Sequence, residues 1–239
     1  MFPPPLFGIA VLSTLLGTGC SLLIEPGENA GNGGPGGDAD CVDQEVTVSG
    51  DDYDGEVYGG MVYDQGEYSE AAGYNRLYLG SWQEGVAWGY FRFALPVAFH
   101  PSHLDGRIRL RLWGEGDLSW NDENDNLQIV LEDTASAGPV TDPNRAPTGS
   151  ADPMLVTQWP STGSGLDWDD GRYNESPDLA ASFRQLNQSY DLQPGQLVQL
   201  WVGRFTDAGE SEVITPDSSQ TDQNWAKLRF ECPGSETDN

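Results

Sequence analysis

Apolar and polar residues alternate with a period of two through much of the chain after residue 41, and this pattern limits the fold more than any other feature. Successive side chains of a β-strand point to opposite faces of the sheet, so the alternation indicates strands with one buried face. Turn-forming pairs such as Asp54-Gly55, Asp105-Gly106 and Pro194-Gly195 separate the segments. The pattern predicts strands at residues 45–48, 56–58, 76–79, 90–95, 107–112, 127–131, 198–202 and 226–232.

A single segment has a helical period instead. Its apolar residues recur three or four positions apart, at Leu179, Phe183, Leu186 and Tyr190. Ser176 is a suitable N-cap for this helix, Pro177 suits its first position, and Asp178 complements the helix dipole. Many strands with one short helix in a connection predict an all-β fold, a β-sandwich of jelly-roll type.

The N-terminal segment predicts export. Residues 1–24 carry no charged side chain, and residues 6–16 form an apolar run of signal-peptide length. The sequence Leu16-Gly17-Thr18-Gly19-Cys20 resembles the bacterial lipoprotein signal, in which the cysteine becomes the lipidated first residue. This resemblance implies a signal peptide at 1–19 and a lipid anchor at Cys20. The following segment has too few apolar groups to pack, so we expect a lipid anchor and flexible glycine-rich tether at 20–40 and, by length, one domain at 41–239. An uncleaved membrane anchor and plain secretion are the alternatives, and all three interpretations predict export.

The cysteines support an oxidising compartment. If Cys20 carries lipid, the chain's three cysteines leave one pair, Cys41 and Cys232. These two lie at opposite ends of the predicted domain, and export favours a disulfide between them. The alternative is a pair of unpaired buried thiols, which is the default in a cytosolic protein.

The net charge of −27 limits the partners. Residues 1–40 contribute four of the 38 acids and no base, which leaves −23 on the domain. Nucleic acids and anionic membranes require a basic surface, so we expect membrane contact through the N-terminal anchor only.

Arg107, Arg109 and Arg111 lie on the polar face of one predicted strand. Pairing with acidic neighbours is favoured there over a ligand surface.

Acidic loops are candidates for a structural Ca²⁺, which prefers several carboxylate, amide and carbonyl oxygens. The candidate ligands lie in two loops, at Asp122, Asn124 and Asp125, and at Asp167, Asp169 and Asp170. A third acidic segment is 51–54. None of the loops is an EF-hand, since the first has Leu127 where that motif requires glycine. The alternative is that these loops are solvated acidic surface.

Eight tryptophans are many for a chain of this length. Sugar-binding sandwiches stack pyranose rings on exposed aromatic faces, because the C–H surface of the sugar is apolar. The candidates for such stacking are the tryptophans in polar loop sequences: Trp120, Trp168, Trp82 and Trp88. The alternative is that tryptophans fill the core or cover its ends.

A longer pattern of short motifs indicates a family. Segment 89–96 (GYFRFALP), a turn, and segment 104–110 (LDGRIRL) are followed by Glu132-Asp133-Thr134, Ala137, Ala146-Pro147-Thr148, Val156-Thr157-Gln158-Trp159, Trp168 and segment 173–179. In this order they resemble bacterial secreted β-sandwich modules of the DNRLRE type and carbohydrate-binding-module-like domains. The resemblance covers about residues 74–230; Leu192-Gln193-Pro194-Gly195 replaces the usual Trp-x-x-Gly. It implies an accessory or adhesive module, with Trp159 structural and with no catalytic residue to carry over.

Catalytic signatures are weak. His100 and His103 are the chain's two histidines, and with Pro101 between them they are interpreted as surface turn residues and not as a zinc site. Gly163-Ser164-Gly165 lacks the strand-to-helix context of a nucleophile elbow. The prediction is therefore no enzyme and no organic cofactor.

Together these features favour a surface-tethered, non-catalytic binding or adhesion module at the outer membrane or cell surface. Glycan binding with a structural Ca²⁺ is its most specific form. The alternative is a structural envelope lipoprotein that contacts protein partners. A glycan-active hydrolase is the least favoured.

Overall fold

The computed structural model describes residues 41–48, 53–64, 76–82, 85–115, 126–147, 149, 151–159, 168–169, 171–205, 211–216 and 224–235. All of them belong to one compact unit, Gly33–Asn239. The predicted signal peptide, Cys20 and the residues up to 40 lie outside the described residues.

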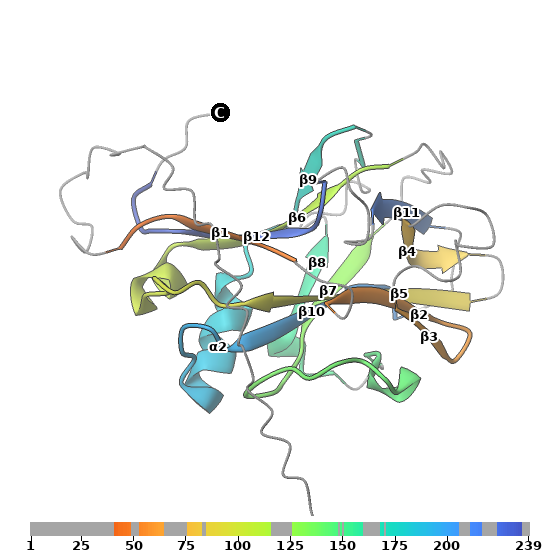
Figure 1. Cartoon of the computed structure of the whole chain (residues 1–239), viewed down its shortest axis with the longest axis horizontal. Coiled ribbons are helices and arrows are strands. Elements are labelled where there is room, and N and C mark those ends of the chain that lie inside the picture. Colours follow the sequence, from red (N-terminus) through yellow and green to blue (C-terminus); the bar gives the residue numbers. More distant parts are fainter. Residues whose placement is uncertain are drawn as a thin grey trace, which may run out of the picture. The chain divides into compact units, whose positions relative to one another are not determined.

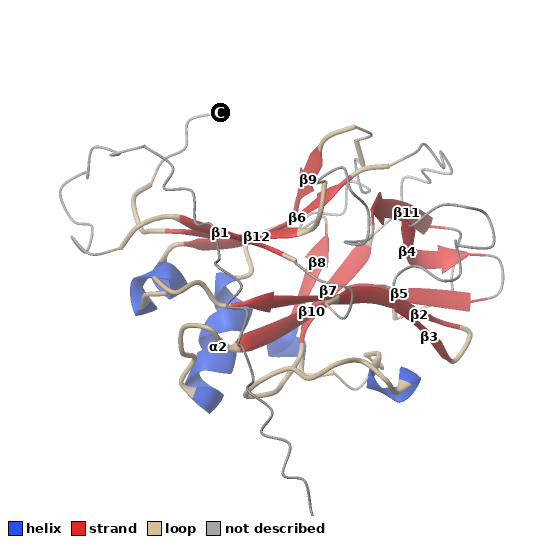
Figure 2. Ribbon diagram, in the orientation of Figure 1, coloured by secondary structure: helices blue, strands red, loops and turns tan. Residues whose placement is uncertain are grey.

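Two antiparallel sheets form the domain (Figures 1 and 2). The smaller sheet has the order β1 (Gln44–Thr47), β12 (Lys227–Glu231), β6 (Arg107–Trp113) and β9 (Tyr173–Glu175). The larger sheet has the order β11 (Ser211–Pro216), β4 (Arg76–Trp82), β5 (Gly85–Ala94), β10 (Leu197–Gly203), β7 (Leu127–Leu131) and β8 (Val156–Trp159). A hairpin of β2 (Asp54–Tyr58) and β3 (Met61–Asp64) joins it through β2 and β5.

Helices are a minor part of the described chain (Figure 2). They comprise one α-helix, α2 (Ala180–Tyr190), and three 3₁₀ helices, η1 (Pro101–Asp105), η2 (Pro143–Arg145) and η3 (Pro153–Leu155). The predicted all-β sandwich with one short helix is therefore confirmed, while jelly-roll connectivity stays a prediction.

The main core lies between the two sheets. Leu110 and Phe230 enter it from the smaller sheet, and Phe91 and Leu200 enter it from the larger one. Phe183 of α2 packs against the same cluster. Burial of each such side chain stabilises the fold by about 1.5–3 kcal/mol, so this layer is the main source of stability.

The alternation predicts the positions of eight strands well but misses four others. All eight predicted segments are strands or overlap strands, and residues 127–131 match β7 at both ends. The structure adds β3, β8, β9 and β11. In β9 the buried residue is Asn174, whose side chain bonds to the backbone of Asp169 at 2.8 and 3.0 Å. A polar residue at the buried position leaves no apolar signal.

The predicted start of the helix is wrong. The Ser176 hydroxyl accepts a hydrogen bond from the Leu110 amide at 2.9 Å, so it pairs with β6 and does not cap the helix. Asp178 accepts hydrogen bonds from the amides of Ala180 at 2.9 Å and Ile108 at 3.0 Å. Because Asp178 satisfies the first free amide, α2 begins at Ala180.

The outer face of the smaller sheet carries ion pairs, as predicted for the arginine strand. Arg111 contacts Glu45 at 2.7 Å and Glu175 at 3.0 Å, and Arg109 contacts Glu175 at 2.9 Å. Burial opposes ionisation of the Glu45 carboxyl, but hydrogen bonds and charge from Arg111 and Lys227 outweigh it and hold its pKa below the ordinary value. Acidic neighbours therefore neutralise this basic face.

Candidate functional site

A cleft of about 280 Å³ lies on the outer face of the larger sheet. Val130 of β7 and Trp201 of β10 form its floor, and both belong to a second apolar cluster, separate from the main core. The walls come from the chain that follows β7, including η2 and η3. In Figure 1 this green segment runs beside β10. The long connection thus covers a sheet face and leaves a hollow between the two.

Glu132 is the polar centre of the cleft. One of its carboxylate oxygens accepts a hydrogen bond from Arg145 at 2.7 Å. The other accepts from the side-chain amide of Gln199 at 2.7 Å and from the indole of Trp201 at 3.4 Å. Charge-assisted hydrogen bonds of this kind hold side chains in defined positions. Glu132 therefore fixes the cleft wall to its floor.

Arg145 holds the covering segment in place. Its guanidinium donates to the carbonyl of Gly138 at 3.1 Å and to that of Pro139. It also forms the ion pair with Glu132 at 2.7 Å, so its charge is neutralised. The one basic side chain that lines the cleft is thus engaged by its own loop and by Glu132.

Two carboxylates remain at the rim. Asp133 and Asp152 line the cleft and are exposed to solvent. Asp152 also accepts a hydrogen bond from the Met154 amide at 2.9 Å, which caps η3. A hydrogen bond to Asp133 raises the pKa of the Tyr190 hydroxyl. With three acids and one base, the lining is net negative and accepts neutral or cationic groups better than anions.

The sequence did not predict this cleft. Glu132-Asp133-Thr134 and Ala146-Pro147 were expected only as landmarks of a family resemblance, with no role in a site. The partners of Glu132 are 13, 67 and 69 positions away along the chain, so no local spacing signals the cluster. One signal was present: β10 (LVQLWVG) has apolar residues at both phases of the alternation, which is typical of a strand covered on both faces.

Of the four candidate stacking tryptophans, the structure describes the side chains of Trp88 and Trp168. Trp88 is only 5% exposed and packs edge-on against Phe205 at 5.2 Å, so its prediction as a sugar platform is wrong. It lies on β5 and is a member of the second apolar cluster. Trp168 is half-buried, with its ring 5.7 Å from that of the buried Trp159. Trp120 and the Trp82 side chain lie outside the described residues.

The predicted calcium ligands are mostly outside the described ranges. Five of the six candidates lie outside the described residues: Asp122, Asn124, Asp125, Asp167 and Asp170. Asp169 is described, and its carboxylate pairs with Arg172. This pairing competes with a role for Asp169 as a cation ligand.

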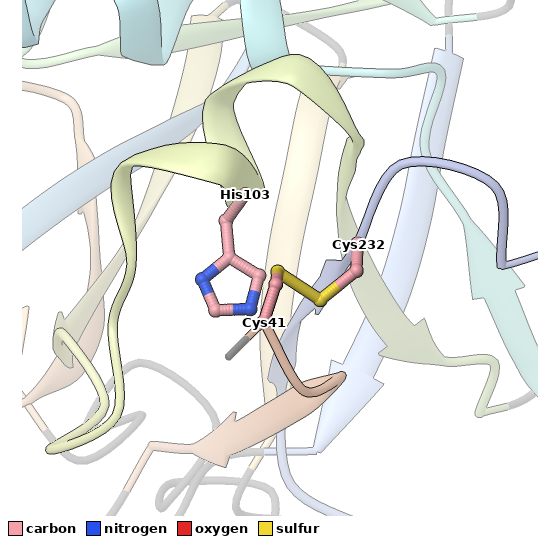
Figure 3. Close-up of side chains that lie close together, drawn as sticks. All are labelled: Cys41, His103 and Cys232. Carbon is pink, nitrogen blue, oxygen red and sulfur yellow. A yellow bond between two sulfur atoms is a disulfide. The ribbon is translucent and has the colours of Figure 1, made fainter. Parts of the chain in front are cut away.

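Within the described ranges, one group of three potential metal ligands is close-packed: Cys41, His103 and Cys232 (Figure 3). Their ligand atoms lie within 4.8 Å of one another. The two sulfur atoms are bonded to each other, which confirms the predicted disulfide. Sulfur in a disulfide is a poor metal ligand, since metals bind the thiolate.

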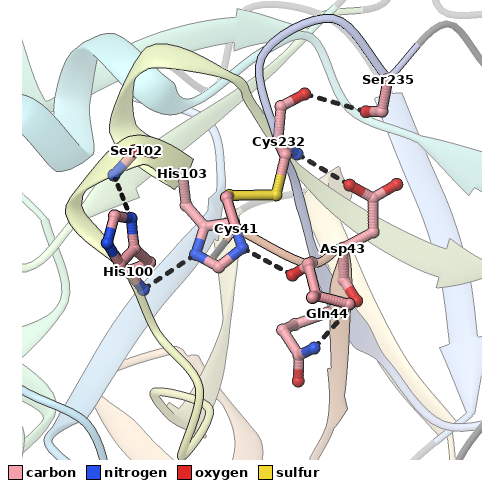
Figure 4. The surroundings of a disulfide bond; sticks show 9 residues. Cys41, Asp43, Gln44, His100, Ser102, His103, Cys232 and Ser235 are labelled. Atoms are coloured by element: carbon pink, nitrogen blue, oxygen red, sulfur yellow. Dashed lines mark hydrogen bonds between the residues drawn. A yellow bond between two sulfur atoms is a disulfide. The ribbon is translucent and has the colours of Figure 1, made fainter. Parts of the chain in front are cut away.

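His103 is also engaged (Figure 4). Its Nδ1 accepts a hydrogen bond from the His100 amide at 3.0 Å, and its Nε2 lies 2.9 Å from the Val42 carbonyl, to which it donates. The ring is 0% exposed and lies 5.9 Å from the rings of Phe99 and Phe230. The interpretation of His103 as a surface turn residue is therefore wrong. Its two hydrogen bonds and its apolar neighbours make it part of the core.

Comparisons with known proteins leave the family open, since no protein-family model matches the chain and no curated protein matches it either. Resemblance to DNRLRE-type and carbohydrate-binding-module-like domains thus stays a prediction. In the described part of the chain, no helix is long and apolar enough to cross a membrane. The fold and the disulfide define the class: a disulfide-closed β-sandwich domain of the kind found outside the cytoplasm.

Proposed function

We propose that this protein is a surface-tethered, non-catalytic binding module and that its cleft binds the end of a glycan. The observation that carries the proposal is the cleft itself, in which Arg145 and Gln199 hold the Glu132 carboxylate in place and two further carboxylates lie at the rim. Small-molecule sites are concave, largely pre-formed and lined by apolar groups with a few oriented polar groups. The cleft has this composition, at the small end of the usual range of volumes.

The chemistry of the lining favours a neutral or amine-bearing sugar. Asp133, Asp152 and Asn144 present acceptors and an amide to ligand hydroxyl groups. Uronic and sulfated sugars would meet a net negative lining and a protein of net charge −27. An ammonium group would instead find two carboxylates at the rim. We therefore expect affinity to fall in the order amino sugar, neutral sugar, acidic sugar.

A binding role suits Glu132 better than a catalytic one. Glycoside hydrolysis requires a carboxylic acid that donates a proton and a second carboxylate beside it. Both oxygens of Glu132 already accept hydrogen bonds from the protein's own side chains, one from the Arg145 guanidinium and one from the Gln199 amide. This supports a positioning role for Glu132.

A glycan array that contains amino, neutral and acidic sugars tests the proposal on the exported protein. Asp133→Asn and Asp152→Asn preserve side-chain shape and remove charge, so each should weaken binding roughly fivefold to tenfold. Asp105→Asn on η1 is the matched control and should bind as the wild type does. Absence of binding to every sugar would reject the proposal. It would favour the alternative, an envelope protein that contacts other proteins.

The anchoring half of the proposal has a separate test. Cys20→Ala should release the protein from the membrane or block its processing. Unchanged mass and unchanged membrane association would reject lipidation at this residue.

A further inference from the structure

The place where the N-terminal chain joins the domain is unusually well fastened. Cys41 lies just before β1 and Cys232 just after β12, and these two strands are antiparallel neighbours. The disulfide closes a loop with a sequence separation of 191, and every described strand lies inside that loop. Any pull along the chain N-terminal to Cys41 therefore reaches the end of β12 through a covalent bond.

Two hydrogen bonds fasten the next two residues to different elements (Figure 4). The Val42 carbonyl accepts from His103 of η1 at 2.9 Å, and the Asp43 carboxylate accepts from the Cys232 amide at 2.8 Å. His103 is itself held by the His100 amide and by Phe230 of the main core. Residues 41–43 are thus tied to η1, to β12 and, through them, to the core.

The two strands at this junction differ greatly in how they resist a pull. Among the described strands, β1 is an edge strand whose one partner is β12, over four residue pairs from Gln44↔Phe230 to Thr47↔Lys227. A strand of this kind that is pulled from its own first residue loses its hydrogen bonds one at a time. β12 pairs with β1 on one side and β6 on the other, and Leu228 and Phe230 anchor it in the core. β12 can move only if its hydrogen bonds to both neighbouring strands break and its two buried side chains leave the core at the same time.

We infer that residues 41–43, with Cys232 and His103, form a force-bearing clamp. The clamp passes tension from the N-terminal chain into the central strand β12 and bypasses the edge strand β1. A domain that is held by its N-terminal chain can then stay folded while a ligand pulls on it. The relevance of such tension rests on the proposed surface tethering, whereas the mechanical property itself does not.

Single-molecule pulling on the full exported chain tests the clamp. One handle is attached to the N-terminal chain, and the other to an azide-bearing residue in place of Met154, which is 59% exposed and lies in η3 beside the cleft. In the oxidised protein we expect a single rupture with no earlier step. After reduction with a dithiol, β1 should detach first, in a step of about 25 Å for residues 41–48. His103→Ala should lower the force of that step further in the reduced protein.

Two controls keep the result decisive. With the disulfide intact, moving the first handle to the exposed Thr47 bypasses the clamp, so β1 should detach at a lower force than the N-terminal chain sustains. With handles at Val97 and Met154, both far from residue 41 in the sequence, reduction should leave the rupture force unchanged. An early step in the oxidised protein, or equal forces from Thr47 and the N-terminal chain, would overturn the clamp. No glycan is used, so failure of the proposed ligand leaves this test intact.

Discussion

The outer faces of the two sheets are built in opposite ways. On the smaller sheet, arginines and Lys227 lie in solvent-facing ion pairs with Glu45 and Glu175. On the larger sheet, the segment after β7 covers the face, so Tyr90 and Trp201 are each 1% exposed. Exposed ion pairs contribute little, because water competes for the charges. Enclosed polar groups must instead be fully paired, because an unpaired one is expensive.

This difference explains where a site can form. On the smaller sheet, the basic and acidic side chains pair with one another and leave a face whose charges are neutralised. On the larger sheet, Glu132 accepts hydrogen bonds from Gln199 of β10 and from Arg145 of the covering segment. The cleft lies between that segment and the sheet. The faces should therefore respond very differently to the loss of one carboxylate.

The largest expected effect concerns the disulfide between Cys41 and Cys232. Cys41→Ser/Cys232→Ser removes a crosslink across 191 positions, and the chain-entropy model assigns such a crosslink about 5 kcal/mol of unfolding free energy. Urea denaturation of the oxidised protein and the double variant measures this loss. An equal midpoint for both would show that the disulfide adds nothing to stability.

The second prediction concerns the predicted calcium ligands. Most of them lie in segments 116–125 and 160–167, which are outside the described residues and fall between β6 and β7 and between β8 and β9 in the sequence. If Ca²⁺ binds there, a hundredfold excess over Kd adds about 2.7 kcal/mol and raises the melting temperature by roughly 5–10 °C. Asp122→Ala/Asp125→Ala or Asp167→Ala/Asp169→Ala should abolish the rise. Equal shifts with Mg²⁺ or NaCl at matched ionic strength would mean simple screening.

A third prediction compares one carboxylate from each face. Glu132→Ala leaves Arg145 and Gln199 without their shared acceptor and should cost about 2–3 kcal/mol of unfolding free energy. Glu45→Ala on the smaller sheet should cost less than about 1 kcal/mol. Chemical denaturation of both variants measures the two losses of unfolding free energy. Similar losses would remove the distinction between the two faces.

The smallest expected effect is the pH response of Glu45. Its pKa is lowered in the folded protein, so its stabilising contribution is complete above the ordinary value of 4.5 and is lost as pH falls through the lower folded value. Glu45→Gln should therefore reduce the acid-side slope of unfolding free energy against pH by a small amount. The two curves should converge at the acid end. A steeper acid-side slope in the variant than in the wild type would contradict the prediction.

Several features follow from the sequence alone, because they depend on local order. The alternation in residues 107–112 and 226–232 indicates strands, since strand geometry repeats every two residues whatever the partner. The cysteine count and the predicted export signal favour a disulfide between Cys41 and Cys232, and the structure confirms this pairing. Arg109 and Arg111 do meet acidic partners, as an acidic chain predicts.

Tertiary structure alone decided which faces are covered. Trp201 occupies the outer phase of β10, where a period-two pattern expects solvent, yet the segment after β7 covers it. Trp88, expected in a polar loop, is buried in β5 against Phe205. His103 lies in a polar, proline-containing segment but is buried, because Phe230 is brought to it from the other end of the domain. Glu132 meets Gln199 across 67 positions. A sequence pattern specifies which side chains share a face, whereas the packing of distant segments determines what lies against that face.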